Sequence, residues 1–363
     1  EEELQEIAST IRNRGKLFLI GPRRFGKTSL LCAAQEAAAA SGAIVIRLDA
    51  ETYETLDLLA GALLATATGS LSGGVQRAME TVRKVAAHLR PQISFDGESF
   101  HVTLGHGRRE GGPLPLLTDA LDAVEALAAQ SKGEVAVILD EIQQIVVEEG
   151  LAAERQLRSA VQRHRHVAYV FAGSSTRLLT DMTEEPDRPF YRLGSRLFLG
   201  AVPREDFHRF LVSGFRETGL SLAEDAASRI LDLAEEVPYN VQRLAHATWE
   251  MTRSHKEPHA GVETVAASLR RIVLREDPAY TQLWTGLTTN QKKALKAVIQ
   301  SGGREVLSAE HTQRLRIPVS SLRTALLALE QAHVIRMEAS LGKSRYRLVD
   351  PFLAEWIAVS QIG

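Results

Sequence analysis

The chain has 363 residues, of which 44% are hydrophobic and 24% charged, and its formal net charge at pH 7 is −2. This composition is typical of a globular protein of two or three domains, and the small net charge argues against a protein coated in nucleic-acid-binding surface. No apolar run approaches the roughly 18 residues that span a bilayer, so the sequence predicts no membrane helix.

The N-terminal residues and the single cysteine bear on the cellular compartment. The segment from Glu1 to Glu6 is acidic, which is the wrong charge for the start of a signal peptide. Cys32 has no partner for an internal disulfide and favours a reducing cytoplasm. We therefore expect a cytoplasmic protein, with Cys32 as a small buried residue rather than a reactive thiol.

A glycine-bounded loop follows a helix predicted at residues 1–15 and a strand predicted at 17–20, and precedes a helix predicted at 27–40. Its pattern, G-x-x-x-x-G-K-T, is typical of loops whose backbone N–H groups hold nucleotide phosphates at a helix N-terminus. The lysine of such a loop reaches the β- and γ-phosphates, and the threonine hydroxyl ligates Mg²⁺. The flanking strand and helix favour this interpretation over a chance match. The predicted nucleotide-binding residues here are Gly21, Pro22, Arg23, Arg24, Phe25, Gly26, Lys27, Thr28 and Ser29.

The next stretch predicts more of an α/β core. A continuous apolar run at 43–49 is typical of a parallel strand that is covered on both faces. Helices are predicted at 54–68, 74–90 and 114–131. Between them, two short runs flank Asp96-Gly97, a strong hairpin signal, so we expect an inserted β-hairpin at about 92–104.

A second strand of chemical interest, 135–139, ends in Asp140-Glu141, which is the Walker B pattern. A carboxylate at the C-terminal edge of a buried parallel strand lies where ligands bind in such sheets. Asp140 is the expected Mg²⁺ ligand, and Glu141 the expected general base for an attacking water. The alternative is a strand followed by two solvated acids, and the upstream loop favours the functional interpretation.

The strand predicted at 166–172 is followed by Gly173 and a cluster of hydroxyl residues that begins at Ser174. Ser174 or Ser175 is a candidate sensor of the γ-phosphate or of the attacking water; the alternative is an N-cap of the following helix. With a helix at 150–164 and a fifth strand at 196–199, the pattern predicts an open parallel α/β sheet of the P-loop type.

Arginines lie between the fourth and fifth predicted strands. Arg192 and Arg196 are candidates for an arginine finger that offsets charge at the γ-phosphate, in cis or in a neighbouring subunit. Surface ion pairs are the alternative for each of them.

Strand signals stop at about residue 203, where four helical patterns predict a compact helical subdomain up to 284. One of these helices begins at Pro238, a residue favoured in the first helical turn. Pro238 or Tyr239 could then lie near adenine and Arg243 near the phosphates. The equal alternative is that Pro238 only starts the helix and Arg243 is only solvated.

The C-terminal segment 285–363 predicts helices at 289–300, 308–314 and 319–332 and strands at 333–339 and 344–349. This order is typical of a winged helix, whose third helix usually enters the major groove of DNA. The third helix carries only Arg323, whereas the strand pair carries Lys343, Arg345 and Arg347, which favours phosphate contact over base reading. From Gly286 onward, eleven Lys or Arg outnumber six Asp or Glu. Double-stranded DNA and a protein are equal candidate partners.

Together these features resemble the archaeal-type ATPase family of the AAA+/STAND P-loop class. The features that carry the resemblance are the loop at 21–31 with Arg23-Arg24, Leu139-Asp140-Glu141-Ile142-Gln143, the hairpin, Gly173-Ser174-Ser175, Pro238-Tyr239, and Tyr346-Arg347-Leu348-Val349-Asp350-Pro351-Phe352. The resemblance implies an ATPase core at 1–202, a helical lid at 203–284 and a winged helix at 285–363, with ATP or ADP and Mg²⁺ as ligands.

The leading hypothesis is a Mg²⁺-dependent ATPase that acts as a molecular switch coupled to DNA, to a protein partner or to a homo-oligomer. A signalling or scaffold protein that binds nucleotide with little turnover is the competing hypothesis. Asp140 and Glu141 together favour the enzyme. The 11 histidines form no cluster with zinc-like spacing, so a metal-dependent nuclease lacks support.

Overall fold

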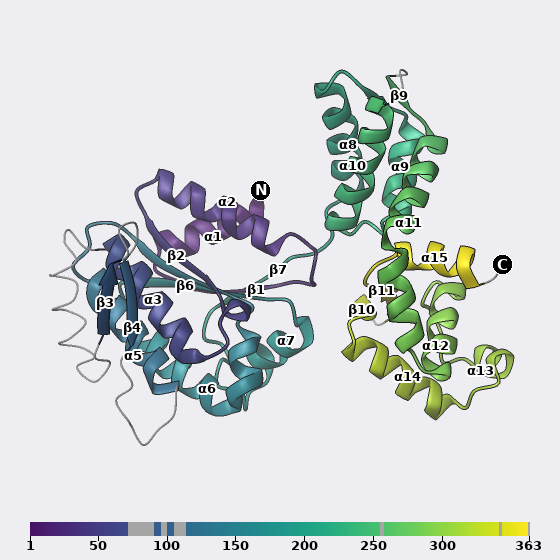
Figure 1. Ribbon diagram of the computed structural model, residues 1–363. Coiled ribbons are helices and arrows are strands. Elements are labelled where there is room, and N and C mark those ends of the chain that lie inside the picture. Colours follow the sequence, from purple (N-terminus) through teal and green to yellow (C-terminus); the bar gives the residue numbers. More distant parts are fainter. Residues whose placement is uncertain (72–90, 96–99, 105–113, 255–257, 341–342, 362–363) are drawn as a thin grey trace. The chain divides into compact units, whose positions relative to one another are not determined.

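The computed structural model describes the chain except for residues 72–90, 96–99, 105–113, 255–257, 341–342 and 362–363 (Figure 1). The chain divides into two compact units, Glu1–Gly200 and Ala201–Gly363. The helix expected at 74–90 lies outside the described residues, as does the side chain of Lys343.

Unit 1 is built on one five-stranded parallel sheet. Its strands, in the order in which they lie side by side, are β2 (Ile44–Asp49), β5 (Val135–Asp140), β6 (Val167–Gly173), β1 (Lys16–Ile20) and β7 (Ser195–Phe198). All residues of β5 and β6 are buried, as expected for strands that are covered on both faces. The five predicted strands and the predicted open parallel sheet are confirmed.

Helices cover both faces of this sheet. They are α1 (Glu2–Arg12), α2 (Lys27–Ala40), the 3-10 turn η1 (Ala50–Thr52), α3 (Leu56–Leu71), α5 (Leu114–Ala128), α6 (Gln143–Arg163) and α7 (Thr176–Glu184). Side chains alternate along each strand: Leu17 and Leu19 belong to the core under α1 and α2, whereas Phe18 and Ile20 belong to the core that includes α3, α5 and α6. Two hydrophobic cores thus hold the sheet between the helices on its two faces; Figure 1 shows these helices.

Helix α6 begins at Gln143, upstream of the start predicted at residue 150. Gly150 interrupts the helix with φ 68° and ψ −157°, a conformation that is almost exclusive to glycine. Because glycine disfavours helix interiors, a helix start predicted at this residue leaves out the segment before it. The earlier start of α6 bears on the site because its first residue lies next to the Asp140-Glu141 pair.

The predicted hairpin is present in unit 1. β3 (Pro91–Phe95) pairs antiparallel with β4 (Phe100–Leu104), and Phe95 lies opposite Phe100. β4 lies against α3.

Unit 2 begins with a bundle of helices. These are α8 (Arg204–Glu217), α9 (Glu224–Leu233), α10 (Pro238–Ser254) and α11 (Val262–Gly286), with a short parallel pair of β8 (Ser221–Leu222) and β9 (His259–Ala260). Helix α11 continues past the predicted end at 275 and through Pro278. A proline usually breaks a helix, which is why the pattern ended the prediction early.

The second part of unit 2 is the predicted winged helix. Its elements are α12 (Thr289–Gln300), α13 (Ala309–Leu315), α14 (Val319–Gln331), the antiparallel pair β10 (Ile335–Ser340) and β11 (Lys343–Leu348), and α15 (Phe352–Gln361). A capping box of Thr288 and Gln291 fixes the start of α12. Helix α15 was not predicted.

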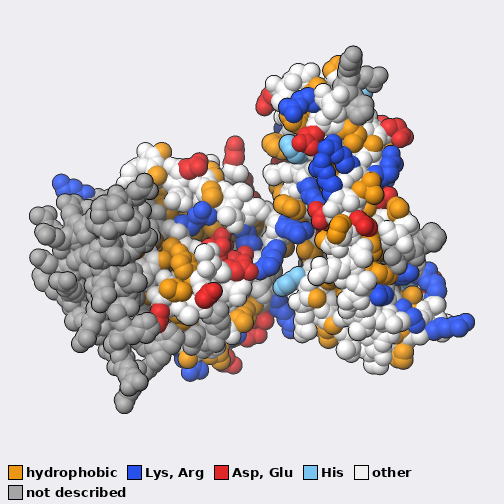
Figure 2. Space-filling model, in the orientation of Figure 1, with side chains coloured by type: hydrophobic (Ala, Val, Ile, Leu, Met, Phe, Trp, Pro, Cys, Tyr) orange, Lys and Arg blue, Asp and Glu red, His pale blue; other side chains and the backbone are white. Residues whose placement is uncertain are grey.

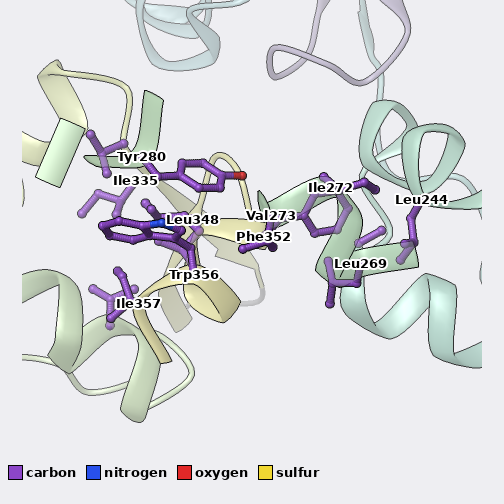
Figure 3. Packing of buried hydrophobic residues seen from close by; sticks show 14 of the residues in the cluster. Leu244, Leu269, Ile272, Val273, Tyr280, Ile335, Leu348, Phe352, Trp356 and Ile357 are labelled. Atoms are coloured by element: carbon purple, nitrogen blue, oxygen red, sulfur yellow. The ribbon is translucent and has the colours of Figure 1, made fainter. Parts of the chain in front are cut away.

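Helix α15 joins the winged helix to α11. Phe352 and Trp356 of α15 pack with Tyr280 of α11 and Leu348 of β11 in one buried cluster (Figure 3). The indole Nε1 of Trp356 donates to Asp277 Oδ1 at 2.7 Å. The helical bundle and the winged helix therefore share a hydrophobic core, and the structure groups the segments predicted as lid and winged-helix domains into one unit.

Candidate nucleotide-binding site

The loop between β1 and α2 depends on its two glycines. Gly26 has φ +89° and precedes α2 as its N-cap, in the left-handed region that glycine adopts most readily. A Cβ on Gly21 would lie 3.0 Å from both the Cβ and the carbonyl oxygen of Leu199. The geometry of the loop therefore requires both glycines. The loop places the N-terminus of α2, a helix of 14 residues, at the C-terminal edge of the sheet.

Lys27 is the first residue of α2 and is only 5% exposed. Its Nζ donates to the carbonyl oxygen of Pro22, 3.3 Å away across the loop. Burial lowers the pKa of Lys27, while the nearby carboxylates of Glu141 and Asp140 act in the opposite direction. The structure thus brings the lysine of the loop close to both acids of the Walker B pattern.

Thr28 and Asp140 meet at the end of β5. The Thr28 hydroxyl donates to Asp140 Oδ2 at 3.2 Å, and the backbone N–H of Glu141 donates to Asp140 Oδ1 at 3.0 Å. Burial, and then the charge of Glu141, raise the pKa of Asp140. Asp49 at the end of β2 pairs with Asp140 in the strand register.

The side-chain oxygens of Thr28 and Asp140 suit Mg²⁺. Among the described residues, no group of three or more His, Cys, Asp or Glu side chains could hold a metal ion by itself. Mg²⁺ is usually held by one or two protein ligands together with substrate phosphates and water, which is the number of donors that Thr28 and Asp140 offer. The donor set therefore fits a metal that arrives with a phosphate ligand.

Glu141 is held by the end of the neighbouring strand. Its Oε2 accepts the N–H of Ser174 at 3.0 Å, the hydroxyl of Ser174 at 2.8 Å, and the side-chain amide of Gln143. Burial favours a higher pKa, but the hydrogen bonds from Gln143 and Ser174 and the charge of Lys27 outweigh it and lower the pKa of Glu141. The carboxylate is thus ionised at neutral pH.

Ser174 was predicted as either a phosphate sensor or a helix cap. Its hydroxyl donates to Glu141, while the N-cap position of α7 falls on Ser175, which makes no side-chain capping bond. The structure therefore joins Ser174 to the acid pair, and its contact with a phosphate stays a prediction.

Arg23 links the loop to the same edge of the sheet. Its Nε donates to Ser174 Oγ at 3.3 Å, and its Nη2 lies 3.0 Å from Glu51 Oε1 in the turn after β2. The sequence reasoning missed Glu51 and Asp49, and it gave Gln143 no role. Asp49 had a usable signal, since it ends an apolar strand as Asp140 does.

The two candidate finger residues make contacts in their own segment. Arg196 pairs with Glu184 of α7, and the guanidinium of Arg192 lies 5.0 Å from the ring centre of Tyr191. Nearby Arg188 pairs at 2.6 Å with Glu154, which is fully buried. A finger role for Arg192 or Arg196 stays a prediction.

The lid candidates lie in unit 2. Pro238 starts α10, and Tyr239 is 48% exposed. Arg243 pairs with Glu276 and lies 3.5 Å from Asp350. This guanidinium therefore has acidic partners within its own unit, and the nucleotide contacts of all three candidates stay predictions.

The basic side chains of the wing also have partners within unit 2. Arg347 lies 3.2 Å from Glu235 and 3.3 Å from Glu338, and Arg336 lies 2.6 Å from Glu338. The Nε of Arg345 donates to the carbonyl oxygen of Gly302 at 2.6 Å. Figure 2 shows Lys and Arg side chains spread over this unit with Asp and Glu among them.

The third helix of the winged helix has a mostly uncharged exposed face. Val319 and Leu327 of α14 are 45% and 50% exposed, and Arg323 is exposed near them. Such a face offers little for base reading, which usually relies on Arg, Lys, Asn or Gln.

Comparison with known proteins confirms this architecture. Residues 278–359 match the family described as a probable winged helix domain. A search of curated proteins found no match. The Walker-type ATPase Paby2304 of Pyrococcus abyssi is similar in structure, with a TM-score of 0.63 and 17% identity over 99% of this chain and 95% of that chain.

Two protein structures from Aeropyrum pernix are also similar. ORC2, in ADPNP-ADP complexes, has a TM-score of 0.59 and 16% identity over 99% of this chain and 92% of that one. ORC1, in complex with DNA, has a TM-score of 0.53 and 16% identity over 100% of this chain and 94% of that one.

The sheet, the loop and these similarities define the class: the chain has the fold of a P-loop ATPase with a C-terminal winged helix. Within that class, the predicted resemblance to archaeal-type ATPases is confirmed at the level of the fold. In the described part of the chain, no helix has the length and hydrophobicity needed to cross a membrane.

Proposed function

We propose that the chain is a Mg²⁺-dependent ATPase that works as a molecular switch. The observation that carries the proposal is the 3.2 Å hydrogen bond from Thr28 to Asp140, which joins the phosphate loop to the Walker B strand. Lys27 and Glu141 complete this edge: against the effect of burial, the charge of Lys27 adds to the hydrogen bonds from Gln143 and Ser174 in lowering the pKa of Glu141. The structural similarity to a Walker-type ATPase and to ORC2 with ADPNP and ADP supports a nucleotide as the ligand.

The mechanism follows from these positions. The loop amides and the Nζ of Lys27 bind the triphosphate at the N-terminus of α2. Thr28 and Asp140 would hold Mg²⁺, which when bound neutralises charge on the β- and γ-phosphates. Glu141, whose lowered pKa keeps it ionised, orients the attacking water and accepts its proton. Arg23 places a further positive charge beside Ser174.

The test is steady-state phosphate release, together with the affinity for a fluorescent ATP analogue. Glu141→Gln keeps a hydrogen-bonding side chain but removes the base, so turnover should fall by about 100-fold to 10,000-fold. Analogue affinity should stay within about twofold, because Glu141 is not a phosphate ligand in this mechanism. Glu134→Gln, at the other end of β5, is the matched control and should retain activity. Undiminished turnover in Glu141→Gln would remove this residue from the mechanism.

A nucleotide-binding switch with little turnover is the second candidate. It is favoured by the three hydrogen bonds that Glu141 Oε2 already accepts, since they lower the pKa of the carboxylate and so make it a weaker base. Analogue binding by the wild-type protein without phosphate release, with and without duplex DNA, would select this candidate.

The partner is proposed to bind through the winged helix. Similarity to ORC1 in complex with DNA and the excess of basic residues after Gly286 support double-stranded DNA. The ion pairs of Arg336 and Arg347 and the exposed apolar residues of α14 support a protein partner or a second copy of the chain. Sedimentation with an ATP analogue and with ADP, each with and without duplex DNA, separates these partners.

A further inference from the structure

Gln143 is a buried polar residue that the mechanism above does not use. It is the first residue of α6, two positions after Glu141, and is 5% exposed. Its Nε2 donates to Glu141 Oε2 and lies 3.3 Å from Ser174 Oγ, to which it also donates. One amide group therefore contacts Glu141, which follows β5, and Ser174, which follows β6.

The chemistry of the neighbours fixes the orientation of this amide. Nε2 faces an ionised carboxylate, and rotation of the amide by 180° would place two oxygens against each other. Oε1 is buried and has no hydrogen-bond partner in the described structure. A buried acceptor without a partner is costly, so the bonds of Nε2 must outweigh that cost.

Gly173 makes room for Gln143. A Cβ built on Gly173 would overlap Gln143 Oε1 and would lie 2.9 Å from a methyl carbon of Leu179. Any residue with a side chain here would push the amide away from Ser174. The φ angle of Gly173 is not positive, so the backbone conformation does not require a glycine at the end of β6. The space taken by Gln143 does.

The two carboxylate oxygens of Glu141 therefore have different surroundings. Among the described residues, the hydrogen bonds that Glu141 accepts through its side chain all end at Oε2: two come from Ser174 and one from Gln143. The other oxygen, Oε1, keeps its lone pairs for a water molecule. A general base needs such an anchored geometry because proton transfer depends on hydrogen-bond reach.

We infer that Gln143 is a positioning residue, which holds Glu141 Oε2 against Ser174 so that Glu141 Oε1 is directed to the attacking water. The inference rests on the proposed ATPase function. Gln143 acts on turnover and not on nucleotide affinity, because its contacts are with Glu141 and Ser174 and not with the loop.

The experiment replaces the amide and keeps the length of the side chain. Gln143→Met should lower kcat by about 10-fold to 100-fold, the usual effect of losing a group that orients a catalytic ligand or base. The KM for ATP and the affinity for the analogue should stay within about twofold. Gln144→Met, at the next position of the same helix, is the matched control and should keep the wild-type kcat. Gln143→Ala, with thermal unfolding of each variant, covers the case in which the methionine disturbs folding.

A double-mutant cycle separates positioning from a general structural role. If Gln143 and Ser174 act through the same oxygen, Gln143→Met and Ser174→Ala together should cost clearly less than the product of their separate effects on kcat. Three results would overturn the inference while leaving the ATPase proposal intact. The effects of the two substitutions on kcat could multiply, the affinity for the analogue could fall along with kcat, or the folded Gln143 variants could keep a kcat within twofold of wild type. Absence of turnover in the wild-type protein would overturn the ATPase proposal and this inference with it.

Discussion

Charged side chains surround the phosphate loop of unit 1 and the wing of unit 2, but the two regions use them differently. In unit 1, Lys27, Asp140 and Glu141 converge at one edge of a sheet, and burial, hydrogen bonds and mutual charge shift their pKa values. In unit 2, Arg336 and Arg347 pair with acidic residues of their own unit.

The difference shows that a count of basic residues predicts a ligand poorly. The excess of Lys and Arg after Gly286 indicated nucleic acid, yet Glu338 alone pairs with two of these arginines. The charges around the loop are concentrated where a phosphate and a metal would lie. Arrangement, rather than net charge, distinguishes the two regions.

The largest expected effect is at the loop. Lys27→Ala should weaken binding of the ATP analogue by about 100-fold or more, because hydrogen bonds between charged groups contribute about 1.5–3 kcal/mol each. Lys132→Ala, an exposed lysine before β5, is the control and should bind normally. The measurement is titration of the fluorescent analogue at fixed Mg²⁺. Normal affinity in Lys27→Ala would contradict the assignment of the charged residues of unit 1 to a phosphate site.

A smaller effect is expected at the wing. Glu338→Ala should release Arg336 and one contact of Arg347, and so raise affinity for duplex DNA by about tenfold at low salt. The slope of log affinity against log salt should steepen by about one or two.

Glu310→Ala serves as the control for Glu338→Ala. It removes the same charge from an exposed position in α13. Anisotropy of a labelled duplex at several salt concentrations provides the readout. Equal gains in both variants would mean that net charge, and not the pairing of Arg336 and Arg347, limits DNA binding.

The smallest expected effect concerns stability. The pKa of Asp140 is raised, so the folded nucleotide-free protein holds the ionised form less favourably than the unfolded chain does. Asp140→Asn should therefore raise the free energy of unfolding by about 1 kcal/mol at neutral pH. The gain should disappear as the pH falls below the ordinary pKa of aspartate, where both variants are neutral at this position.

Chemical denaturation at several pH values measures this gain. Asp187→Asn, in an exposed loop, is the control and should change stability little. A loss of stability in Asp140→Asn would show that its bonds to Thr28 and Glu141 outweigh the cost of burying the charge.

The sequence by itself determined the phosphate loop, the five strands, the hairpin and the winged helix. These features depend on local physics: buried strands require continuous apolar runs, and a loop that approaches phosphates requires glycines at fixed spacing. Local rules also caused the errors. Gly150 and Pro278 act against helix formation, yet α6 resumes after the kink at Gly150 and α11 continues through Pro278.

Only the tertiary structure decided which side chains meet. Thr28 and Asp140 are 112 positions apart, and Glu141 and Ser174 are 33 apart, so no local pattern could pair them. The parallel sheet brings these residues together because the C-terminal ends of β5 and β6 lie side by side at one edge. The same holds for Gln143, whose burial and partners depend on a glycine of another strand. Spacing along the chain identified the chemical groups, and packing of the sheet determined their geometry.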